Sequence, residues 1–143
     1  MEASLNTLID TSVLSLALRR KPQDLSAAER SVVAELSEVI QEGRARIIGP
    51  VRQELLSGIK NLAQYEKLRL TLRAFPDEPI DTRDYESAAK AGNDCRSKGI
   101  GVSAVDILIC AVTLARQWSI FTMDPDFRNY ARVLPIKLHS TRG

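Results

Sequence analysis

Short apolar runs alternate along the chain with longer stretches in which apolar residues recur every three or four positions. The short runs predict buried strands, and the longer stretches predict helices with one apolar face. Strands are expected at residues 5–9, 46–49, 119–122 and 134–138, with a weak one near Ile80. Helices are expected at residues 11–20, 26–42, 50–58, 61–74, 82–98, 103–117 and 125–132.

Local signals support several of these helix ends. Ser26 followed by Glu29 has the spacing of a capping box, and Gly43 suits the end of the same helix. Pro50 suits the first turn of the next helix. The alternation of strands and helices predicts an α/β fold, in which a parallel sheet is flanked by helices. No repeat or linker is visible, so we expect a single domain over residues 1–143.

Composition and charge narrow the classes of function. The 20 Lys and Arg residues against 18 Asp and Glu give a net charge of +2, which excludes a protein held on nucleic acid by charge alone. The single histidine, His139, excludes a zinc site with two histidine ligands. Cys95 and Cys110 are too few for a disulfide scaffold. No apolar run is long enough to span a membrane, and Glu2 stands where a signal peptide has positive charge, so we expect a soluble, cytoplasmic protein.

Three carboxylates stand where the predicted strands end. Asp10 follows the first strand, Glu54 lies on the helix after the second strand, and Asp124 follows the strand at 119–122. Ligands of such sheets bind at the carboxyl ends of the strands, so we expect these side chains to converge. Each has a purely structural alternative: Asp10 and Asp124 can cap helices, and Glu54 can be a solvated helix residue.

Asp106 interrupts the apolar run of residues 105–112. A buried carboxylate requires a partner, a proton or a metal ion, and the residues at helical spacing offer no cation. Carboxylates about 4 Å apart repel by about 4 kcal/mol at an effective dielectric constant of about 20. Divalent cations remove this repulsion, and oxygen ligands suit Mg²⁺ or Mn²⁺. A site of this kind is suited to phosphoryl chemistry.

Four segments of the chain, in order, resemble the motifs of the PIN-domain family. They are Leu8-Ile9-Asp10-Thr11-Ser12-Val13, Val51-Arg52-Gln53-Glu54-Leu55-Leu56-Ser57-Gly58, Val102-Ser103-Ala104-Val105-Asp106-Ile107-Leu108-Ile109-Cys110-Ala111 and Thr122-Met123-Asp124-Pro125-Asp126-Phe127. Their order and spacing agree with the family along essentially the whole chain. The size of the chain resembles that of the single-domain VapC-type toxins of toxin–antitoxin pairs.

This resemblance implies a PIN-like three-layer fold with a central parallel sheet in the strand order 3-2-1-4-5. It also implies a Mg²⁺- or Mn²⁺-dependent endoribonuclease that cleaves RNA, such as tRNA or rRNA, with a metal-activated water. The implied partners are a cognate antitoxin and a second copy of the chain, in a homodimer or a toxin–antitoxin hetero-oligomer. The residues that match the family's catalytic metal-binding acids are Asp10, Glu54, Asp106 and Asp124, with Asp126 as a further acid.

Ser12 and Thr122 match small hydroxyl positions near the metal ions, and each has an alternative role in a turn or cap. Asp126 has an alternative role as a first-turn helix acid. An antitoxin segment is expected in a groove between the helices at 27–40 and 62–72. The cations expected to hold RNA are Arg19, Arg20, Lys21, Arg44, Arg46 and Arg52, and the aromatic residues able to stack on bases are Tyr65, Tyr85 and Trp118.

Two other classes of protein stay open at this point. A receiver-like phosphotransfer domain has an acidic pair after its first strand, whereas this chain has Thr11 and Ser12 after Asp10. A non-catalytic α/β module that binds a partner predicts no thermal stabilisation by metal ions.

Overall fold

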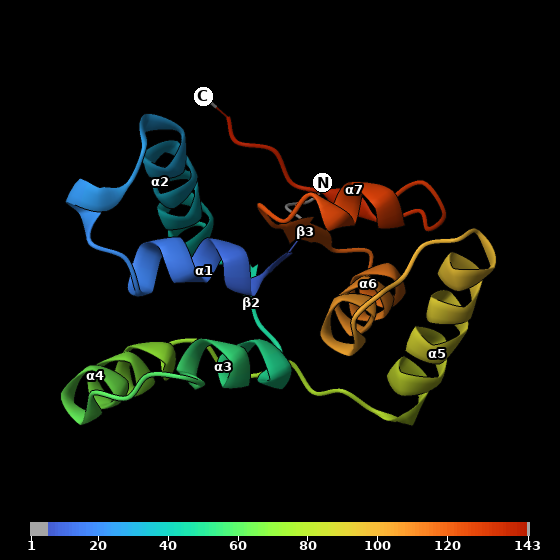
Figure 1. Ribbon diagram of the computed structural model, residues 1–143, viewed down its shortest axis with the longest axis horizontal. Coiled ribbons are helices and arrows are strands. Elements are labelled where there is room, and N and C mark those ends of the chain that lie inside the picture. Colours follow the sequence, from blue (N-terminus) through green and yellow to red (C-terminus); the bar gives the residue numbers. More distant parts are fainter. Residues whose placement is uncertain (1–5, 143) are drawn as a thin grey trace.

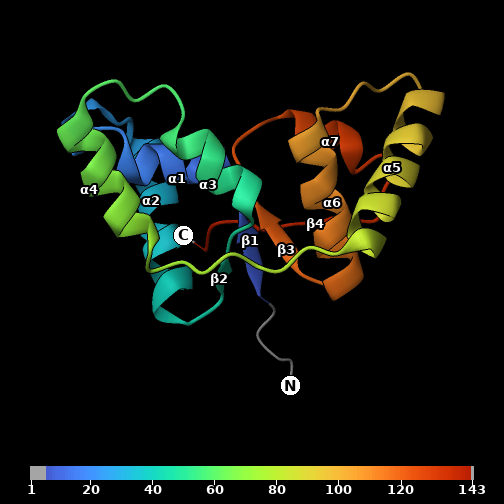
Figure 2. The same cartoon turned by 90° about the horizontal axis from the view of Figure 1, so that it is seen from below.

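The structure of the protein is a computed structural model that describes residues 6–142, and it has three layers. Helices α1–α4 lie on one side of a central sheet and helices α5–α7 lie on the other (Figures 1 and 2). The strands are β1 (Thr7–Ile9), β2 (Ala45–Arg46), β3 (Ser119–Phe121) and β4 (Lys137–Leu138). The helices are α1 (Thr11–Leu18), the 3-10 helix η1 (Pro22–Asp24), α2 (Ala27–Gln41), α3 (Gly49–Leu56), α4 (Leu62–Leu72), α5 (Thr82–Ser97), α6 (Ala104–Arg116) and α7 (Asp126–Tyr130).

The strands form a parallel sheet in the order β2-β1-β3-β4, which confirms the α/β class predicted from the sequence. A parallel bridge between Ile47 and Asp77 lies next to β2, at the position of strand 3 in the expected order 3-2-1-4-5. The prediction of a strand near Ile80 is wrong. Pro76 and Pro79 flank the bridge at Asp77, and because proline has no N–H group, the bridge does not extend into a longer ladder.

The observed elements are shorter than the predicted ones. The first strand was expected from residue 5, which lies outside the described residues, and β1 begins at Thr7. The last strand contains only Lys137–Leu138, because Pro135 cannot donate a ladder hydrogen bond. The capping box of α2 is confirmed: the Ser26 N–H donates to Glu29 Oε1 at 2.9 Å, and the Glu29 N–H donates to Ser26 Oγ at 3.1 Å.

The core lies on both faces of the two central strands. Every residue of β1 and β3 is buried, as expected for parallel strands that helices cover on both sides. In α6, the residues from Ile107 to Thr113 are buried without a break, so this helix is packed between β3 and α5. Asp106 therefore stands where the buried part of α6 begins. Among the helices of residues 6–142, none combines the length and the apolarity needed to cross a membrane.

The single histidine belongs to an ion-pair network that fixes the C-terminal segment. His139 Nε2 lies 2.7 Å from Glu35 Oε2, and Glu35 is buried in α2. Arg142 donates to the same carboxylate and also to Glu42. Burial raises the pKa of Glu35, but the hydrogen bonds from His139 and Arg142 outweigh burial and lower it overall. This network gives His139 a structural role.

Candidate metal centre

Asp106, Asp124 and Asp126 meet at the carboxyl edge of the sheet. Each offers one carboxylate oxygen, and the three oxygens lie within 4.8 Å of one another. Asp106 stands in the first turn of α6, whose N-cap is Ser103, and the other two follow β3. Asp126 is exposed, while Asp106 and Asp124 are half-buried. Within residues 6–142, this is the one group of three or more potential ligands with this spacing.

Asp10 stands beside this cluster at the end of β1. Its side chain is 5% exposed and makes no capping bond to α1. Instead, Asp10 Oδ2 accepts hydrogen bonds from Ser12 Oγ at 2.8 Å and from Thr122 Oγ1 at 2.7 Å. Thr122 Oγ1 also accepts from the Asp124 N–H at 3.0 Å. The two hydroxyls that the sequence placed near the metal ions therefore connect the end of β1 to the end of β3.

Glu54 is not part of the three-aspartate cluster. It is exposed on α3, and its Oε1 accepts a hydrogen bond of 2.6 Å from Thr11 Oγ1. It lines a cavity of about 500 Å³ together with Val105, the residue before Asp106. The structure thus brings Glu54 to the same side of the molecule as Asp106 but keeps it hydrogen-bonded to α1.

Negative charge is crowded at Asp106. Burial raises the pKa of its carboxyl group above the ordinary value, and the charges of Asp10 and Asp124 raise it further. A hydrogen bond from Tyr130 opposes this shift without cancelling it. The negative charge of Asp10 therefore acts on Asp106 as that of Asp124 does, although Asp10 lies outside the three-aspartate cluster. A bound cation would relieve this repulsion.

The Asp124 side chain also accepts a hydrogen bond from the neighbouring backbone. Its Oδ1 accepts a hydrogen bond of 2.9 Å from the Asp126 N–H, which holds the start of α7. The N-cap position of α7 is Pro125, so Asp124 stabilises the turn before the helix and does not occupy the N-cap position itself. Because the bond uses only one of the two carboxylate oxygens, the other oxygen of Asp124 stays available to a ligand.

Tyr130 is a site residue that the sequence analysis missed. Its hydroxyl donates to Asp106 Oδ2 at 2.8 Å, and the residue is 2% exposed. Its ring packs edge-on against Phe127, with 5.1 Å between the ring centroids. Burial, and then the bond to Asp106, raise the pKa of the Tyr130 hydroxyl, so it stays a proton donor. The available signal was its position four residues after Asp126, one turn along the same helix.

Three of the cations proposed to hold RNA instead hold the fold. Arg52 donates to Asp77 at 3.0 Å, to the Leu72 carbonyl at 2.9 Å and to the Phe75 carbonyl. Arg46 donates to backbone carbonyls, and Arg44 forms an ion pair with Glu42. The remaining three cations are exposed at the end of α1 and in the segment that follows: Arg19, Arg20 and Lys21.

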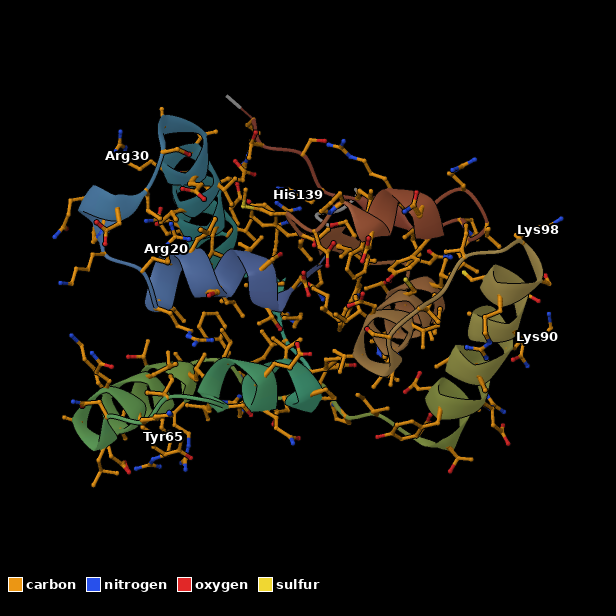
Figure 3. The ribbon with its side chains drawn as sticks, in the orientation of Figure 1. Arg20, Arg30, Tyr65, Lys90, Lys98 and His139 are labelled. Carbon is orange, nitrogen blue, oxygen red and sulfur yellow. The ribbon has the colours of Figure 1, made fainter. Side chains whose placement is uncertain are left out.

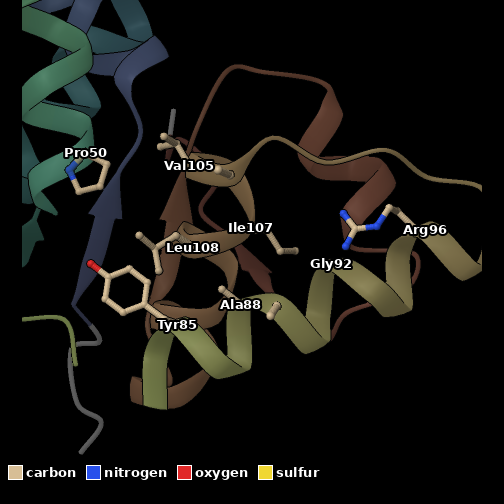
Figure 4. A pocket seen from close by; sticks show the side chains of 10 residues that line it. Pro50, Tyr85, Ala88, Gly92, Arg96, Val105, Ile107 and Leu108 are labelled. Carbon is tan, nitrogen blue, oxygen red and sulfur yellow. The ribbon is translucent and has the colours of Figure 1, made fainter. Parts of the chain in front are cut away.

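The candidate aromatic residues lie away from the acids. Trp118 stacks under Arg116, with 5.8 Å between the guanidinium carbon and the ring centroid. Tyr85 is 57% exposed at one end of an apolar cavity of about 310 Å³ between α5 and α6 (Figure 4). Pro50 lies across from Tyr85, and Arg96 lies at the other end. No carboxylate lines this cavity, and Pro50 and Val105 line both it and the cavity beside Glu54.

The antitoxin groove expected between α2 and α4 stays a prediction, and the cavity described beside α4 is formed with α1. A cavity of about 810 Å³ lies between the end of α1 and α4, and no residue of α2 lines it. The buried residues of α2 are Glu35, Leu36 and Val39.

Comparisons with known proteins agree with this geometry. The family described as PIN domain matches residues 7–133. No curated protein matches the chain. Solved structures that share its fold include FitAcB from Neisseria gonorrhoeae, which is 23% identical in sequence, with 94% of this chain and 97% of that chain covered and a TM-score of 0.74. VapBC-1 from nontypeable Haemophilus influenzae is 13% identical, with 97% of this chain and 100% of that chain covered and a TM-score of 0.72. VapBC2 from Rickettsia felis, bound to a DNA fragment from its promoter, is 15% identical, with 94% of this chain and 98% of that chain covered and a TM-score of 0.71.

Proposed function

Because the chain belongs to the PIN domain family, we propose that it is a Mg²⁺- or Mn²⁺-dependent endoribonuclease and the toxin of a toxin–antitoxin pair. One observation carries the proposal: three aspartates offer oxygens within 4.8 Å of one another at the carboxyl edge of the sheet. Ligands of parallel α/β sheets bind at this edge. Asp10, at the end of the neighbouring strand, adds a fourth negative charge.

The residues present fit a divalent cation. The donors are carboxylate oxygens, which are the ligands that Mg²⁺ and Mn²⁺ prefer. Burial, and then the charges of Asp10 and Asp124, raise the pKa of Asp106, so a cation is favoured beside it. Asp106, Asp124 and Asp126 would hold the cation, with Asp10 beside them and Glu54 as an outer acid on α3. When bound, the cation supplies positive charge for phosphate oxygens and lowers the pKa of a water that can attack the phosphodiester.

The rest of the site orients these acids. Ser12 and Thr122 both donate to Oδ2 of Asp10, which leaves Oδ1 outside the hydroxyl network. Tyr130 binds one oxygen of Asp106 and leaves the other to the cluster. Hydrogen bonds of this kind fix the orientation of metal ligands and are typical of metal sites. No histidine takes part, since His139 is bound to Glu35.

The proposed partners follow from the solved structures that share the fold. Their names describe FitAcB and VapBC assemblies, and a further one is a toxin–antitoxin complex from Klebsiella pneumoniae. We therefore propose a cognate antitoxin as the inhibitor and a homodimer or toxin–antitoxin hetero-oligomer as the assembled form. The substrate would be cytoplasmic RNA, such as tRNA or rRNA, and the whole chain would form one PIN domain.

The proposal is tested by incubating the purified protein with total RNA and Mg²⁺. We expect cleavage that EDTA abolishes and that Mn²⁺ restores. Asp106→Asn should remove the activity, whereas Glu38→Gln, which removes an exposed charge from α2, should not. Equal cleavage by the wild type and Asp106→Asn would overturn the assignment of the site. Absence of cleavage together with absence of thermal stabilisation by Mg²⁺ would favour the non-catalytic module instead.

A further inference from the structure

The cavity between α1 and α4 is lined by cations and contains no carboxylate. Its volume is about 810 Å³. The five cations that line it are Arg19, Arg20, Lys21, Lys60 and Lys67. We refer to these five residues and the cavity between them as the basic cleft. Because the whole chain carries a net charge of only +2, the basic cleft is a strong local concentration of positive charge.

The charges of the basic cleft are directed to solvent. All five residues are exposed. Arg20 lies 3.9 Å from Glu29, which is a long surface pair and contributes little. Among residues 6–142, no ion pair or hydrogen bond occupies the side chains of Arg19, Lys21, Lys60 or Lys67. Side chains that end in nitrogen reach into the space between α1 and α4 in Figure 3.

The basic cleft and the cavity beside Glu54 follow one another along α1 and adjoin where α3 ends. We refer to the carboxyl edge of the sheet, with Asp10, Glu54 and the three-aspartate cluster, as the acidic edge. The cavity beside Glu54 is lined by Thr11, at the start of α1, and by Ser57, after α3. The basic cleft is lined by Ala17, near the end of α1, and by Gly58, the next residue after Ser57. The eight residues of α1 are about 12 Å long. At about 3.4 Å per nucleotide of a stacked strand, three or four nucleotides cover this length.

We propose that the basic cleft binds the phosphate backbone of the RNA substrate three or four nucleotides away from the cleaved bond. The inference rests on the proposed nuclease function and adds a binding site to it. Phosphates are the anions that a row of exposed Lys and Arg residues holds without sequence preference. The cleft is also lined by the apolar residues Leu18, Ile59 and Leu68 and by the polar residues Asn61, Gln64 and Thr71. The cleft therefore contributes affinity and salt dependence, and the acidic edge contributes cleavage.

The test measures RNA binding without cleavage. A fluorescent single-stranded RNA is titrated with the Asp106→Asn protein in EDTA, and the anisotropy gives the affinity at several salt concentrations. The cleft variant adds Lys60→Gln and Lys67→Gln. The control adds Lys90→Gln on α5 and Lys98→Gln at the C-cap of α5, at the other end of the molecule (Figure 3). Both pairs remove the same charge from exposed positions, and thermal melting verifies that both proteins are folded.

We expect the cleft variant to lower the slope of log K against log salt by about 1.4, which is about 0.7 for each lost phosphate contact. Near 0.1 M salt this corresponds to a loss of affinity of about 25-fold. The control should bind as the Asp106→Asn parent does. In cleavage assays, a cleft variant with Asp106 intact should lose activity on long RNA but keep its activity on a dinucleotide, which is too short to reach the cleft.

Two results overturn the inference. The first is equal RNA affinity and salt slope for the cleft variant and the control. The second is unchanged RNA affinity combined with cleft-dependent binding of an acidic amphipathic peptide, which would assign the cleft to a protein partner. Metal-dependent cleavage by the wild type in either case would leave the proposed function standing. Conversely, cleavage that survives Asp106→Asn would remove the proposed function whatever the cleft binds.

Discussion

Asp106→Asn should stabilise the metal-free protein while it removes metal binding. Asn has nearly the same shape as Asp and keeps an oxygen that can accept the hydrogen bond from Tyr130. At 4.8 Å, two unit charges repel by about 3.5 kcal/mol at an effective dielectric constant of about 20, and by about 0.9 kcal/mol at about 80. Since Asp106 is half-buried and Asp126 is exposed, the relevant value lies between these limits. We expect the free energy of unfolding at pH 7 to rise by about 1–3 kcal/mol.

The assay is thermal unfolding of both proteins in EDTA and in Mg²⁺. Each kcal/mol raises the Tm of a domain of this size by about 2–4 °C, so the variant should melt several degrees above the wild type in EDTA. Added Mg²⁺ should stabilise the wild type, because ligands that bind only the folded state raise its stability, and should leave the variant unchanged. Glu38→Gln, which removes an exposed charge from α2, should behave as the wild type does.

The stability advantage of Asp106→Asn over the wild type should increase as the pH rises. Burial and the neighbouring charges raise the pKa of Asp106 in the folded protein above the ordinary value of 3.8. The folded state therefore binds this proton more tightly than the unfolded chain does, and the wild type loses stability as the pH rises through the raised pKa. Below the ordinary pKa, the wild type and Asp106→Asn should be equally stable. A variant that is no more stable than the wild type in EDTA at pH 7 would refute the claim that these carboxylates repel one another.

Three further substitutions test other parts of the account. Tyr130→Phe should keep the ring packing and weaken Mg²⁺ binding about 10–100-fold, as measured by calorimetric titration, because the orienting bond to Asp106 is lost. Arg116→Gln should lower the free energy of unfolding by about 3–5 kcal/mol in urea titrations, because it leaves Asp84, which is buried and accepts two hydrogen bonds from Arg116, without its partner. Ser26→Ala should cost about 1 kcal/mol in the same titrations, since it removes the N-cap of α2.

The sequence predicted the parts of the site that depend on strand ends. Asp10 directly follows β1 and Asp124 lies three residues after β3, and the parallel order of these strands brings their ends to one edge. Asp106 was visible because it interrupts an apolar run, and in the structure it stands where the buried part of α6 begins. Local patterns of this kind are readable because each depends on a few neighbouring residues.

The parts that the sequence missed depend on tertiary contacts. Tyr130 reaches Asp106 across 24 positions of the chain. Its spacing from Asp126 places it on the same helix face but does not identify Asp106 as its partner. Arg52 appeared to be a free cation, yet it binds carbonyls at the end of α4 that become its neighbours only in the folded protein. Glu54 stays a predicted metal ligand; its hydrogen bond to Thr11 is a tertiary contact that the sequence pattern did not indicate.

Only part of the basic cleft could be predicted from the sequence. Arg19, Arg20 and Lys21 were visible as a cluster, but Lys60 and Lys67 join them only because α4 packs beside the end of α1. A net charge of +2 argued against binding by charge alone, and the structure separates that near-neutral sum into an acidic edge and a basic cleft. A total charge therefore says little about a local surface.

The central claim is that the aspartates at the carboxyl edge of the sheet support metal-dependent cleavage of RNA. The most direct measurement is sequencing of RNA ends after incubation of total RNA with the purified protein and Mg²⁺. We predict new ends at discrete positions with the wild type, and none with EDTA or with Asp106→Asn. New ends that appear equally with Asp106→Asn, or that persist in EDTA, would contradict it.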